Sequence, residues 1–333
     1  MRVFAFEFFS GGGLVGRPCP AGLAREGDLM LSTLVRDLAE LPGVTVLASR
    51  DPRLPPLAHC ETLLPLPAED LSSLYIRGLD GCDAAWPVAP EGAGVLEQLT
   101  RYTERAGKLL LGCRPEAVRL TASKRSTARV LRDHGVPVVP TFILGHTPAT
   151  IDGPWVVKPD DGAGCEDTEL CDGRDAALER LATDPARLIA QPWIDGEPLS
   201  LSLICRDGIS RLLCVNRQNI QVRRGRISLA SVTVNAVVDG DGRFARLGER
   251  IAAAIPGLWG YVGVDMVLAK DGPVVLEINP RLTTSYCGLR TALGLNPAEL
   301  VADLLIPSDR PAAGPKPGSG AAAEIRLEPS HAH

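Results

Sequence analysis

The sequence is poor in aromatic residues and has no long apolar run. Its 333 residues include only four Trp, four Tyr and six Phe. No stretch approaches the roughly 18 consecutive apolar residues of a membrane-spanning helix. The formal net charge is -5 with both signs mixed along the chain, so there is no basic stripe with interleaved aromatic residues. These absences argue against a membrane or a nucleic acid as the main partner.

The cysteines show no sign of a disulfide framework or a zinc site. There are nine, an odd number, scattered without a CxxC pair. The apolar N-terminus, residues 1–9, is too short for a signal-peptide core and contains Glu7. We therefore expect a reduced, soluble, cytoplasmic protein. With 45% apolar residues, the chain is long enough for two or three packed subdomains. Whether it forms a homo-oligomer is left open.

The first part of the chain alternates between strand and helix patterns. Residues 2–9 read as a strand that ends in a triple-glycine turn, and apolar residues with helical spacing follow at 30–41. A strand at 44–47 comes next, and the same alternation returns between residues 82 and 112. This pattern favours a doubly wound parallel sheet, which we assign to residues 1–117.

Two further segments have clear local signals. Residues 123–134 read as a capped helix that stops at Gly135. From residue 307 to 333 the chain is rich in Pro, Gly, Ser and Ala, and such a stretch buries too little apolar area to offset its ordering entropy. We expect a flexible tail there. His331 and His333 lie in it and are poor metal candidates.

The most informative features are two polar segments about 120 residues apart. In the first, Lys158 ends an apolar strand and is followed by a turn containing Gly162 and Gly164, an arrangement that suits phosphate oxygens. In the second, Glu277 and Asn279 stand two residues apart on a strand, so both side chains point from one face. Oxygen ligands of this kind suit a hard cation such as Mg²⁺. Together the segments predict a nucleotide-phosphate and metal site.

Asp265 joins this site only in one strand register. Its strand is connected to the Glu277 strand through residues 270–272. If those three residues form the loop, Ala269 faces Pro273 and Asp265 lies opposite Glu277. A two-residue loop would place the two carboxylates on opposite faces, because side chains alternate along a strand.

The order of these parts along the chain resembles the ATP-grasp superfamily over residues 118 to 305. The resemblance implies α/β and α+β architecture, with the doubly wound domain acting as a pre-ATP-grasp domain. Two ATP-grasp subdomains would follow, 118–190 with the Gly-rich loop and 191–306 with the metal site. Tail residues 307–333 would lie outside them.

The resemblance also implies the roles of individual residues. ATP would be bound by phosphate-contacting, loop, adenine-contacting and ribose-contacting residues: Lys124, Lys158, Gly162, Gly164, Gln191, Trp193, Ile194 and Glu197. One or two Mg²⁺ ions, or Mn²⁺ in their place, would be bound by Asp265, Glu277 and Asn279. Arg281 would be catalytic, because its guanidinium can neutralise charge on a transferred phosphoryl group.

Several of these residues have simpler alternative roles. Lys124 could be an ordinary solvated lysine, and Glu197 a solvated turn carboxylate. Lys158 could pair with Asp160 or Asp161, and Arg281 could pair with Glu277.

Candidate substrate residues lie outside the motifs. The segment at Asn216 and Arg217 is polar between apolar strands and could face phosphates or substrate. Glu7 ends the first strand before the glycine turn, where ligands bind in a doubly wound sheet. It could hold the amino group of a substrate. Its alternative is an exposed or Arg25-paired scaffold residue.

Within the superfamily, three segments look like the tyramine-glutamate ligase group of methanofuran biosynthesis: residues 6–13, 25–30 and 277–286. That resemblance implies an ADP-forming ligase. Such a ligase activates a carboxylate, for example that of glutamate or another amino acid, as an acyl phosphate and then joins it to an amine such as tyramine. It also implies a place in methanofuran or one-carbon cofactor biosynthesis. The alternatives are another amino acid or peptide ligase, a kinase, and a non-catalytic ATP-binding regulatory protein.

Overall fold

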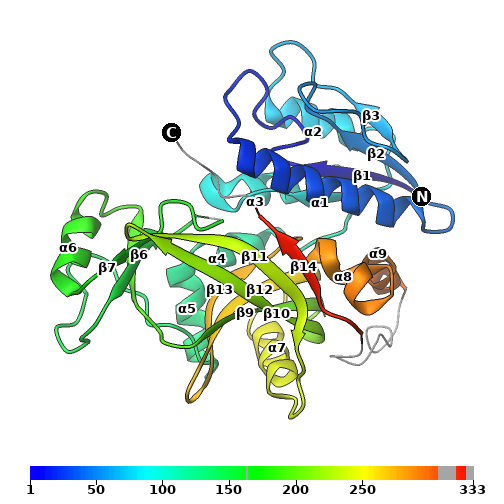
Figure 1. Ribbon diagram of the computed structural model, residues 1–333. Helices are drawn as coiled ribbons and strands as arrows, with labels where there is room; N and C mark the ends of the chain where they lie inside the picture. Colours follow the sequence, from blue (N-terminus) through cyan, green and yellow to red (C-terminus); the bar gives the residue numbers. More distant parts are fainter. Residues whose placement is uncertain (163, 307–319, 328–333) are drawn as a thin grey trace.

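The computed structural model describes residues 1–162, 164–306 and 320–327. Figure 1 shows two sheets, one above the other, with helices around each. The upper sheet belongs to the N-terminal part of the chain. The lower sheet contains the remaining strands and extends into a small lobe at one side (Figure 1).

The N-terminal sheet has five parallel strands in the order β3-β2-β1-β4-β5. The strands are β1 (Arg2–Glu7), β2 (Thr45–Ser49), β3 (Glu61–Leu63), β4 (Ala84–Val88) and β5 (Leu109–Leu110). The helices that connect them are α1 (Ala21–Ala39), α2 (Leu71–Leu79) and α3 (Val95–Arg105), with the short turn η1 (Gly92–Gly94) before α3.

The alternation of side chains along β1 explains why helices cover both faces of this sheet. Phe4 and Phe6 are buried in the cluster that contains Leu74 of α2 and Leu99 of α3. Their neighbours Val3 and Ala5 are buried in a second cluster, with α1. Successive residues of a strand point to opposite faces, so both faces of the central strand must be apolar. The predicted doubly wound sheet is confirmed, although β1 ends at Glu7 and not at residue 9.

Two helices connect the sheets: α4 (Pro115–Ala122) and α5 (Lys124–Asp133). The side chain of Ser123 accepts a hydrogen bond from the Ser126 backbone N–H at 3.0 Å, which caps α5. This confirms the predicted capped helix. The cap also fixes the position of Lys124, the first residue of α5.

The second sheet has nine strands, eight of them in the order β13-β12-β9-β10-β11-β7-β6-β8, and its pairings are antiparallel. Its strands are β6 (Trp155–Pro159), β7 (Glu169–Cys171), β8 (Leu188–Pro192), β9 (Glu197–Arg206), β10 (Ile209–Arg223), β11 (Arg226–Val237), β12 (Gly260–Ala269), β13 (Gly272–Asn279) and β14 (Ala323–Arg326). The remaining helices are α6 (Arg174–Ala182), α7 (Arg243–Ala254), α8 (Tyr286–Leu293), α9 (Pro297–Ala302) and the short turn η2 (Asp303–Leu305).

The apolar core is continuous between the two sheets. One cluster joins Phe6 of β1 and Leu99 of α3 to Leu201 of β9 and Val264 of β12. A separate small cluster around Trp155 and Leu181 fills the lobe of β6, β7, β8 and α6, which lies at the left in Figure 1. The lobe therefore has its own core, whereas two larger clusters each contain residues of both sheets.

The predicted flexible tail is wrong for part of its length. Residues 323–326 form β14, which pairs antiparallel with β11 from Ser231↔Arg326 to Val234↔Ala323. The Pro- and Gly-rich composition concealed this short strand, whose inward side chains Ala323 and Ile325 pack against the core. The predicted tail segments 307–319 and 328–333, the latter with His331 and His333, lie outside the described residues.

No helix in the described parts of the chain is long and apolar enough to cross a membrane.

Gly78 provides a test of the packing between α2 and β1. A Cβ atom at this position would lie 2.1 Å from Cζ of Phe4. Gly78→Ala should therefore lower the free energy of unfolding by about 2 kcal/mol, even though Ala favours a helix. Denaturant titration of both proteins measures the change. Gly240→Ala is the control, because nothing lies within 4 Å of the corresponding Cβ. Equal stability of the Gly78 variant and the wild type would contradict the described packing.

Candidate active site

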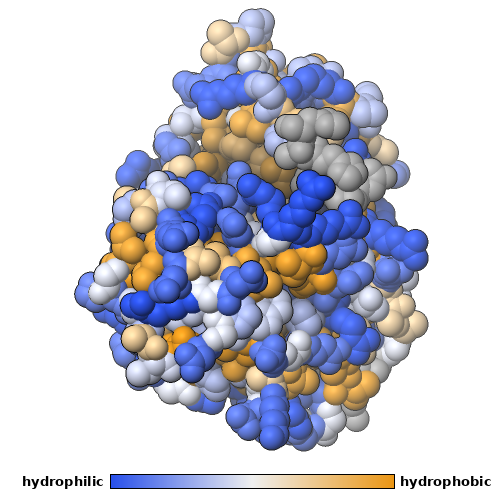
Figure 2. All heavy atoms as spheres, turned by 60° about the vertical axis from the view of Figure 1, so that its left-hand side comes forward, coloured by the Kyte–Doolittle hydropathy of each residue, from blue (hydrophilic) through white to orange (hydrophobic). Residues whose placement is uncertain are grey.

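A cavity of about 530 Å³ opens where the N-terminal sheet, the small lobe and the large sheet meet. It is lined by parts of the chain that are far apart in sequence: the start of α1, Lys124, the turn after β6, the end of β8, and strands β10 to β13. Figure 2 shows apolar surface set back between hydrophilic rims on the side of the molecule that faces the viewer. The cavity thus combines apolar walls with a few convergent polar groups, as ligand sites commonly do.

The cavity collects most of the residues proposed from sequence. Of the predicted nucleotide, metal and catalytic residues, those that line it are Lys124, Lys158, Gly162, Gly164, Gln191, Trp193, Ile194, Asp265, Glu277, Asn279 and Arg281. Four predicted residues are absent from the lining: Glu7, Glu197, Asn216 and Arg217.

Asp265 and Glu277 lie directly opposite each other on β12 and β13, but not for the reason given by the predicted loop. The loop has two residues, because Ala269 pairs with Gly272 and not with Pro273. That register alone would put Leu276 opposite Asp265. A β-bulge between Asp265 and Met266 shifts the pairing by one residue and restores Asp265↔Glu277. The predicted neighbourhood of the two carboxylates is confirmed, and the predicted loop is wrong.

Two lysines approach Glu277 from the other side of the cavity. The ammonium group of Lys158 lies 3.3 Å from Glu277 Oε2, and that of Lys124 lies 3.6 Å away. Burial alone would raise the pKa of Glu277, but the two ammonium groups outweigh it and lower the pKa to about 2. Glu277 is therefore a carboxylate at neutral pH. The alternative pairing of Lys158 with Asp160 or Asp161 is wrong.

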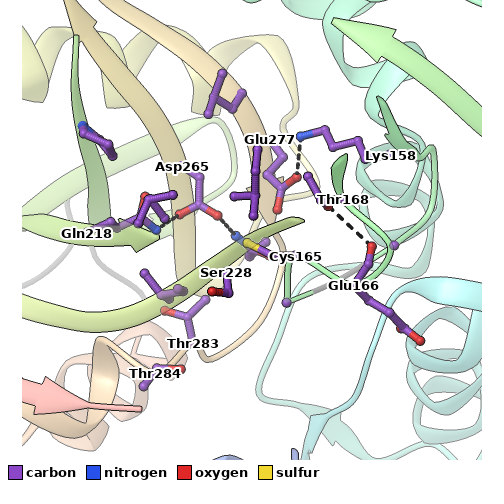
Figure 3. Close-up of a pocket in the computed structure, with 18 of the residues that line it drawn as sticks. Lys158, Cys165, Glu166, Thr168, Gln218, Ser228, Asp265, Glu277, Thr283 and Thr284 are labelled. Carbon is purple, nitrogen blue, oxygen red and sulfur yellow. Dashed lines mark hydrogen bonds and ion pairs between the residues drawn. The ribbon is translucent and has the colours of Figure 1, made fainter. Parts of the chain in front are cut away.

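Asp265 is held by amide groups and not by cations. Gln218 Nε2 donates to one of its oxygens at 2.9 Å, and Asn279 Nδ2 donates to the other at 3.0 Å. Figure 3 shows Gln218 and Lys158 on opposite sides of the two carboxylates. Burial, together with the negative charge of Glu277, raises the pKa of Asp265 to about 6. Two half-buried carboxylates on neighbouring strands favour a cation between them.

The oxygen donors of this pair fit a divalent metal that keeps other ligands. Among the residues that the structure describes, no three His, Cys, Asp or Glu side chains gather as a metal site. Asp265, Glu277 and the amide of Asn279 form a smaller oxygen set on one face of β12 and β13. Mg²⁺ is commonly bound by one or two carboxylates together with substrate phosphates and water. The donor set therefore fits Mg²⁺ better than a metal that requires a complete protein cage.

The glycine turn after β6 is fixed at its base. Asp160 accepts hydrogen bonds from the Arg125 backbone N–H at 2.8 Å and from Ser123 Oγ at 2.6 Å. The Gly162 carbonyl accepts a bond from Lys124 Nζ at 2.5 Å. Gly164 has φ of +64°, a conformation that residues with a side chain rarely adopt. The turn is thus anchored to the start of α5, and Gly162 and Gly164 line the cavity.

The end of β8 forms the apolar side of the cavity. Gln191 pairs with Val156 of β6, and both line the cavity. The Gln191 amide nitrogen donates to Thr141 Oγ1 at 3.0 Å, which orients the side chain. Trp193 and Ile194 follow on the same edge. This arrangement offers flat apolar surface beside backbone polar groups, the combination that a nucleobase requires.

Three candidate residues lie elsewhere. Asn216 is fully buried, and its amide nitrogen donates to Ser200 Oγ and Ser202 Oγ. Arg217 is directed away from the cavity and donates to the carboxylate of Glu197 at 2.5 Å. The predicted substrate contacts of Asn216 and Arg217 are not supported by this geometry, and the assignment of Glu197 to ribose stays a prediction. The neighbouring residue Gln218 is the one that faces the cavity.

Arg281 pairs with a residue that sequence reasoning missed. Its guanidinium donates to both oxygens of Glu91, at 2.9 and 3.2 Å, and not to Glu277. Burial opposes the charge on Arg281, but Glu91 keeps the pKa of Arg281 above its ordinary value. Glu91 precedes η1 in the N-terminal part of the chain, and no motif distinguishes it. The pair therefore joins the two sheets beside the metal-binding face.

Glu7 is buried and not part of the cavity wall. The Ser10 backbone N–H and Ser10 Oγ both donate to its Oε2 at 2.7 Å. Helix α1 passes over the carboxyl group at Gly27, where a Cβ atom would lie 2.2 Å from Glu7 Oε2. The carboxylate from α1 that does line the cavity is Glu26, which accepts a hydrogen bond from Thr284 Oγ1. Glu26 lies one position before Gly27, the glycine that covers Glu7. The sequence alone does not show which of the two carboxylates, Glu7 or Glu26, faces the cavity.

The buried position of Glu7 gives a pH-dependent contribution to stability. Burial raises the pKa of Glu7 from 4.5 to about 7, against the hydrogen bonds from Ser10. A raised pKa in the folded state means that the contribution is present below pH 4.5 and is lost as the pH rises through 7. Relative to Glu7→Gln, the wild type should lose about 3 kcal/mol between pH 4.5 and 8.

Urea unfolding of both proteins across this pH range measures the difference. Glu179→Gln, on the exposed side of α6, is the control. If the difference between wild type and Glu7→Gln stays constant with pH, Glu7 does not titrate in this range.

Two family models match the chain over separate segments. The ATP-grasp domain matches residues 121–285, and the pre ATP-grasp 3 domain matches residues 44–118. The first contains the cavity residues from Lys124 to Arg281. The second contains most of the N-terminal parallel sheet and Glu91.

The chain is also similar to curated proteins over most of its length. It is 31% identical to the tyramine–L-glutamate ligase of Methanocaldococcus jannaschii over 85% of this chain and 82% of that protein. It is 30% identical to the corresponding ligase of Methanocaldococcus fervens, over 84% of this chain and 87% of that protein. The similarity thus includes both domains and not the nucleotide site alone.

Solved structures show the same arrangement of domains. A putative ATP-grasp superfamily protein from Archaeoglobus fulgidus superposes with a TM-score of 0.71 at 25% identity, over 98% of this chain and 100% of that one. An L-amino acid ligase from Bacillus licheniformis gives 0.65 at 19% identity, over 90% of this chain and 73% of that one, which shows the shared fold. The chain belongs to the ATP-grasp superfamily and is an ATP-dependent carbon–nitrogen ligase of that type.

Proposed function

We propose that the enzyme joins a carboxyl group of L-glutamate, the γ-carboxyl, to the amine of tyramine and releases ADP and phosphate. The similarity to two tyramine–L-glutamate ligases along more than four-fifths of the chain supports this choice of substrates. The reaction would serve methanofuran or a related one-carbon cofactor.

One observation carries the ligase chemistry. Lys124 and Lys158 converge on Glu277, which lies opposite Asp265 inside the cavity. The residues that line the cavity include no His that could activate a Ser or Cys as a nucleophile. Two ammonium groups beside two carboxylates suit a polyphosphate and the divalent cation that accompanies it. Such a site positions groups and neutralises charge, which phosphoryl transfer requires more than covalent catalysis by the protein.

The proposed reaction has two steps. A carboxylate oxygen of glutamate attacks the γ-phosphorus of ATP, the bond to the bridging oxygen breaks, and ADP leaves. The amine nitrogen then attacks the carbonyl carbon of the acyl phosphate, phosphate leaves with the C–O bonding electrons, and the nitrogen loses a proton. Lys124, Lys158 and Arg281 would neutralise phosphate charge in both steps, and Asp265, Glu277 and Asn279 would hold Mg²⁺.

Each substrate has a matching part of the cavity. The adenine would lie against Val156 of β6 and Trp193, which follows β8, with the phosphates directed to the lysines. The glutamate and the amine would occupy the opposite end, where Glu26 and Thr284 provide polar groups from different domains. Glu26, and not Glu7, is then the residue placed to meet a substrate ammonium group.

An ADP-release screen of carboxylic acids against amines, with phosphate measured in parallel, tests the substrates. Glutamate and tyramine together should yield equal amounts of ADP and phosphate, and neither alone should support sustained turnover. Sustained phosphate-free ADP formation with one substrate would indicate a kinase. Absence of turnover with any pair would contradict the proposed ligase reaction.

Glu277→Gln tests the metal-binding role while keeping the shape of the side chain. Losing this charge should lower kcat by about 100-fold or more, because the cation is held less firmly beside the phosphates. The Mg²⁺ dependence of the residual rate measures the effect, and circular dichroism verifies the fold. Glu104→Gln, on the exposed side of α3, is the control. Turnover of the Glu277 variant at the wild-type rate would contradict the metal-binding role of Glu277.

A further inference from the structure

The C-terminal strand β14 extends the wall of the cavity beyond the region matched by the ATP-grasp model. Its four residues pair with β11, and the Leu327 backbone N–H continues the ladder by donating to the Ala230 carbonyl at 2.8 Å. The matched ATP-grasp segment ends at residue 285. Leu327 nevertheless lines the same cavity as the predicted phosphate and metal residues.

The pairing across three strands shows which side of β14 faces the cavity. Gln218 of β10 pairs with Val232 of β11, which pairs with Ile325 of β14, so these three side chains share one face. Gln218 reaches Asp265 from that face. Because side chains alternate, Leu327 lies on the same face as Ile325, two residues nearer to the end of the strand.

A second β-bulge keeps this face apolar next to Leu327. The β10–β11 register shifts between Asn219 and Ile220, which leaves Ala230 without an opposite residue and pairs Ile220 with Leu229. Ile220 and Leu229 thereby stay on the face of Gln218 and both line the cavity. The carbonyl of the bulged Ala230 is the one that receives the hydrogen bond from Leu327.

The strand is fixed in place by the packing of its inner side chains. Ala323 and Ile325 pack against the cluster that contains Tyr286 and Leu289 of α8. Helix α8 approaches closely at Gly288, where a Cβ atom would lie 3.3 Å from Ile325 Cδ1. In Figure 1 the tip of β14 points up toward the N-terminal sheet. Leu23 and Leu29 of α1 line the cavity as well.

This apolar group comes from other elements than the proposed ATP-binding residues. Those residues come from α5, β6, the glycine turn and the end of β8, whereas Leu23, Leu229 and Leu327 come from α1, β11 and the end of β14. Glu26 and Thr284, which are hydrogen-bonded to each other, lie at the same end of α1 and before α8. An apolar wall beside a carboxylate suits an amine that has an apolar body.

We propose that Leu327 forms a wall of the pocket for the apolar body of the acceptor amine, so that β14 determines selectivity for this substrate. The inference rests on the proposed ligase function and adds a specificity-determining residue that lies outside the ATP-grasp motifs. It predicts effects on the amine, and not on ATP.

Steady-state kinetics of the full chain with Leu327→Ala tests the proposal. The KM for tyramine should rise about fivefold, because part of a buried apolar contact is lost. The KM values for ATP and glutamate should stay within about twofold of wild type, as should the KM for ethylamine, which has little apolar body to lose. Glu299→Ala is the control, because Glu299 is exposed on α9 and does not line the cavity.

A second variant separates the loss of a contact with the amine from a general loosening of β14. Leu327→Phe keeps an apolar side chain in β14 and narrows the pocket, so it should raise the KM for tyramine more than the KM for ethylamine. Hydrogen exchange of residues 320–327 shows whether β14 stays docked in each variant.

Three results separate the inference from the proposed function. Turnover by both Leu327 variants with an unchanged KM for tyramine would overturn the role of Leu327 and leave the ligase function intact. An equal rise in the KM values for tyramine and ATP would also overturn it, because the strand would then act on the whole site. Absence of wild-type turnover with every substrate pair would overturn the proposed function and, with it, this inference.

Discussion

The facing carboxylates of Asp265 and Glu277 impose a constraint that the surrounding structure satisfies. Two half-buried negative charges on neighbouring strands repel each other and are costly to remove even partly from water. Two ammonium groups from different elements stabilise Glu277 on one side, and two amide donors stabilise Asp265 on the other. The site is therefore preorganised: each group that would contact a phosphate or a cation already has a defined position before either is bound.

This preorganisation connects parts of the sequence that no local pattern joins. Lys124 comes from the start of α5, and its ammonium also bonds the Gly162 carbonyl in the glycine turn. Arg281 follows the metal residues but is held by Glu91 of the N-terminal domain. The geometry of the phosphate site thus depends on the contact between the two domains as well as on the ATP-grasp segment.

Sequence patterns predicted what is periodic or carried by a motif. The apolar alternation of β1 and the capped start of α5 were visible, as were the lysines, glycines and acids that converge on the cavity. What escaped were features set by pairing at a distance. The bulge opposite Asp265 depends on how β13 fits β12, and a one-residue shift reverses every side chain. Strand β14 is too short to show a period of its own. Asn216 and Gln218 share one face of β10, and only their tertiary partners separate them: Asn216 is buried against Ser200 and Ser202, whereas Gln218 reaches Asp265. Glu91 and Glu26 carry no local signature because their partners lie about 190 and 258 residues away.

The bidentate ion pair between Arg281 and Glu91 affects how cooperatively the two domains unfold. If the N-terminal domain opened alone, the guanidinium of Arg281 and the carboxylate of Glu91 would lose each other, and the apolar cluster that continues from Phe6 to Val264 would be cut in two. Both penalties oppose a state in which one domain is folded and the other is not. The domains are thereby coupled into a single cooperative unit, and loss of either one dismantles the site.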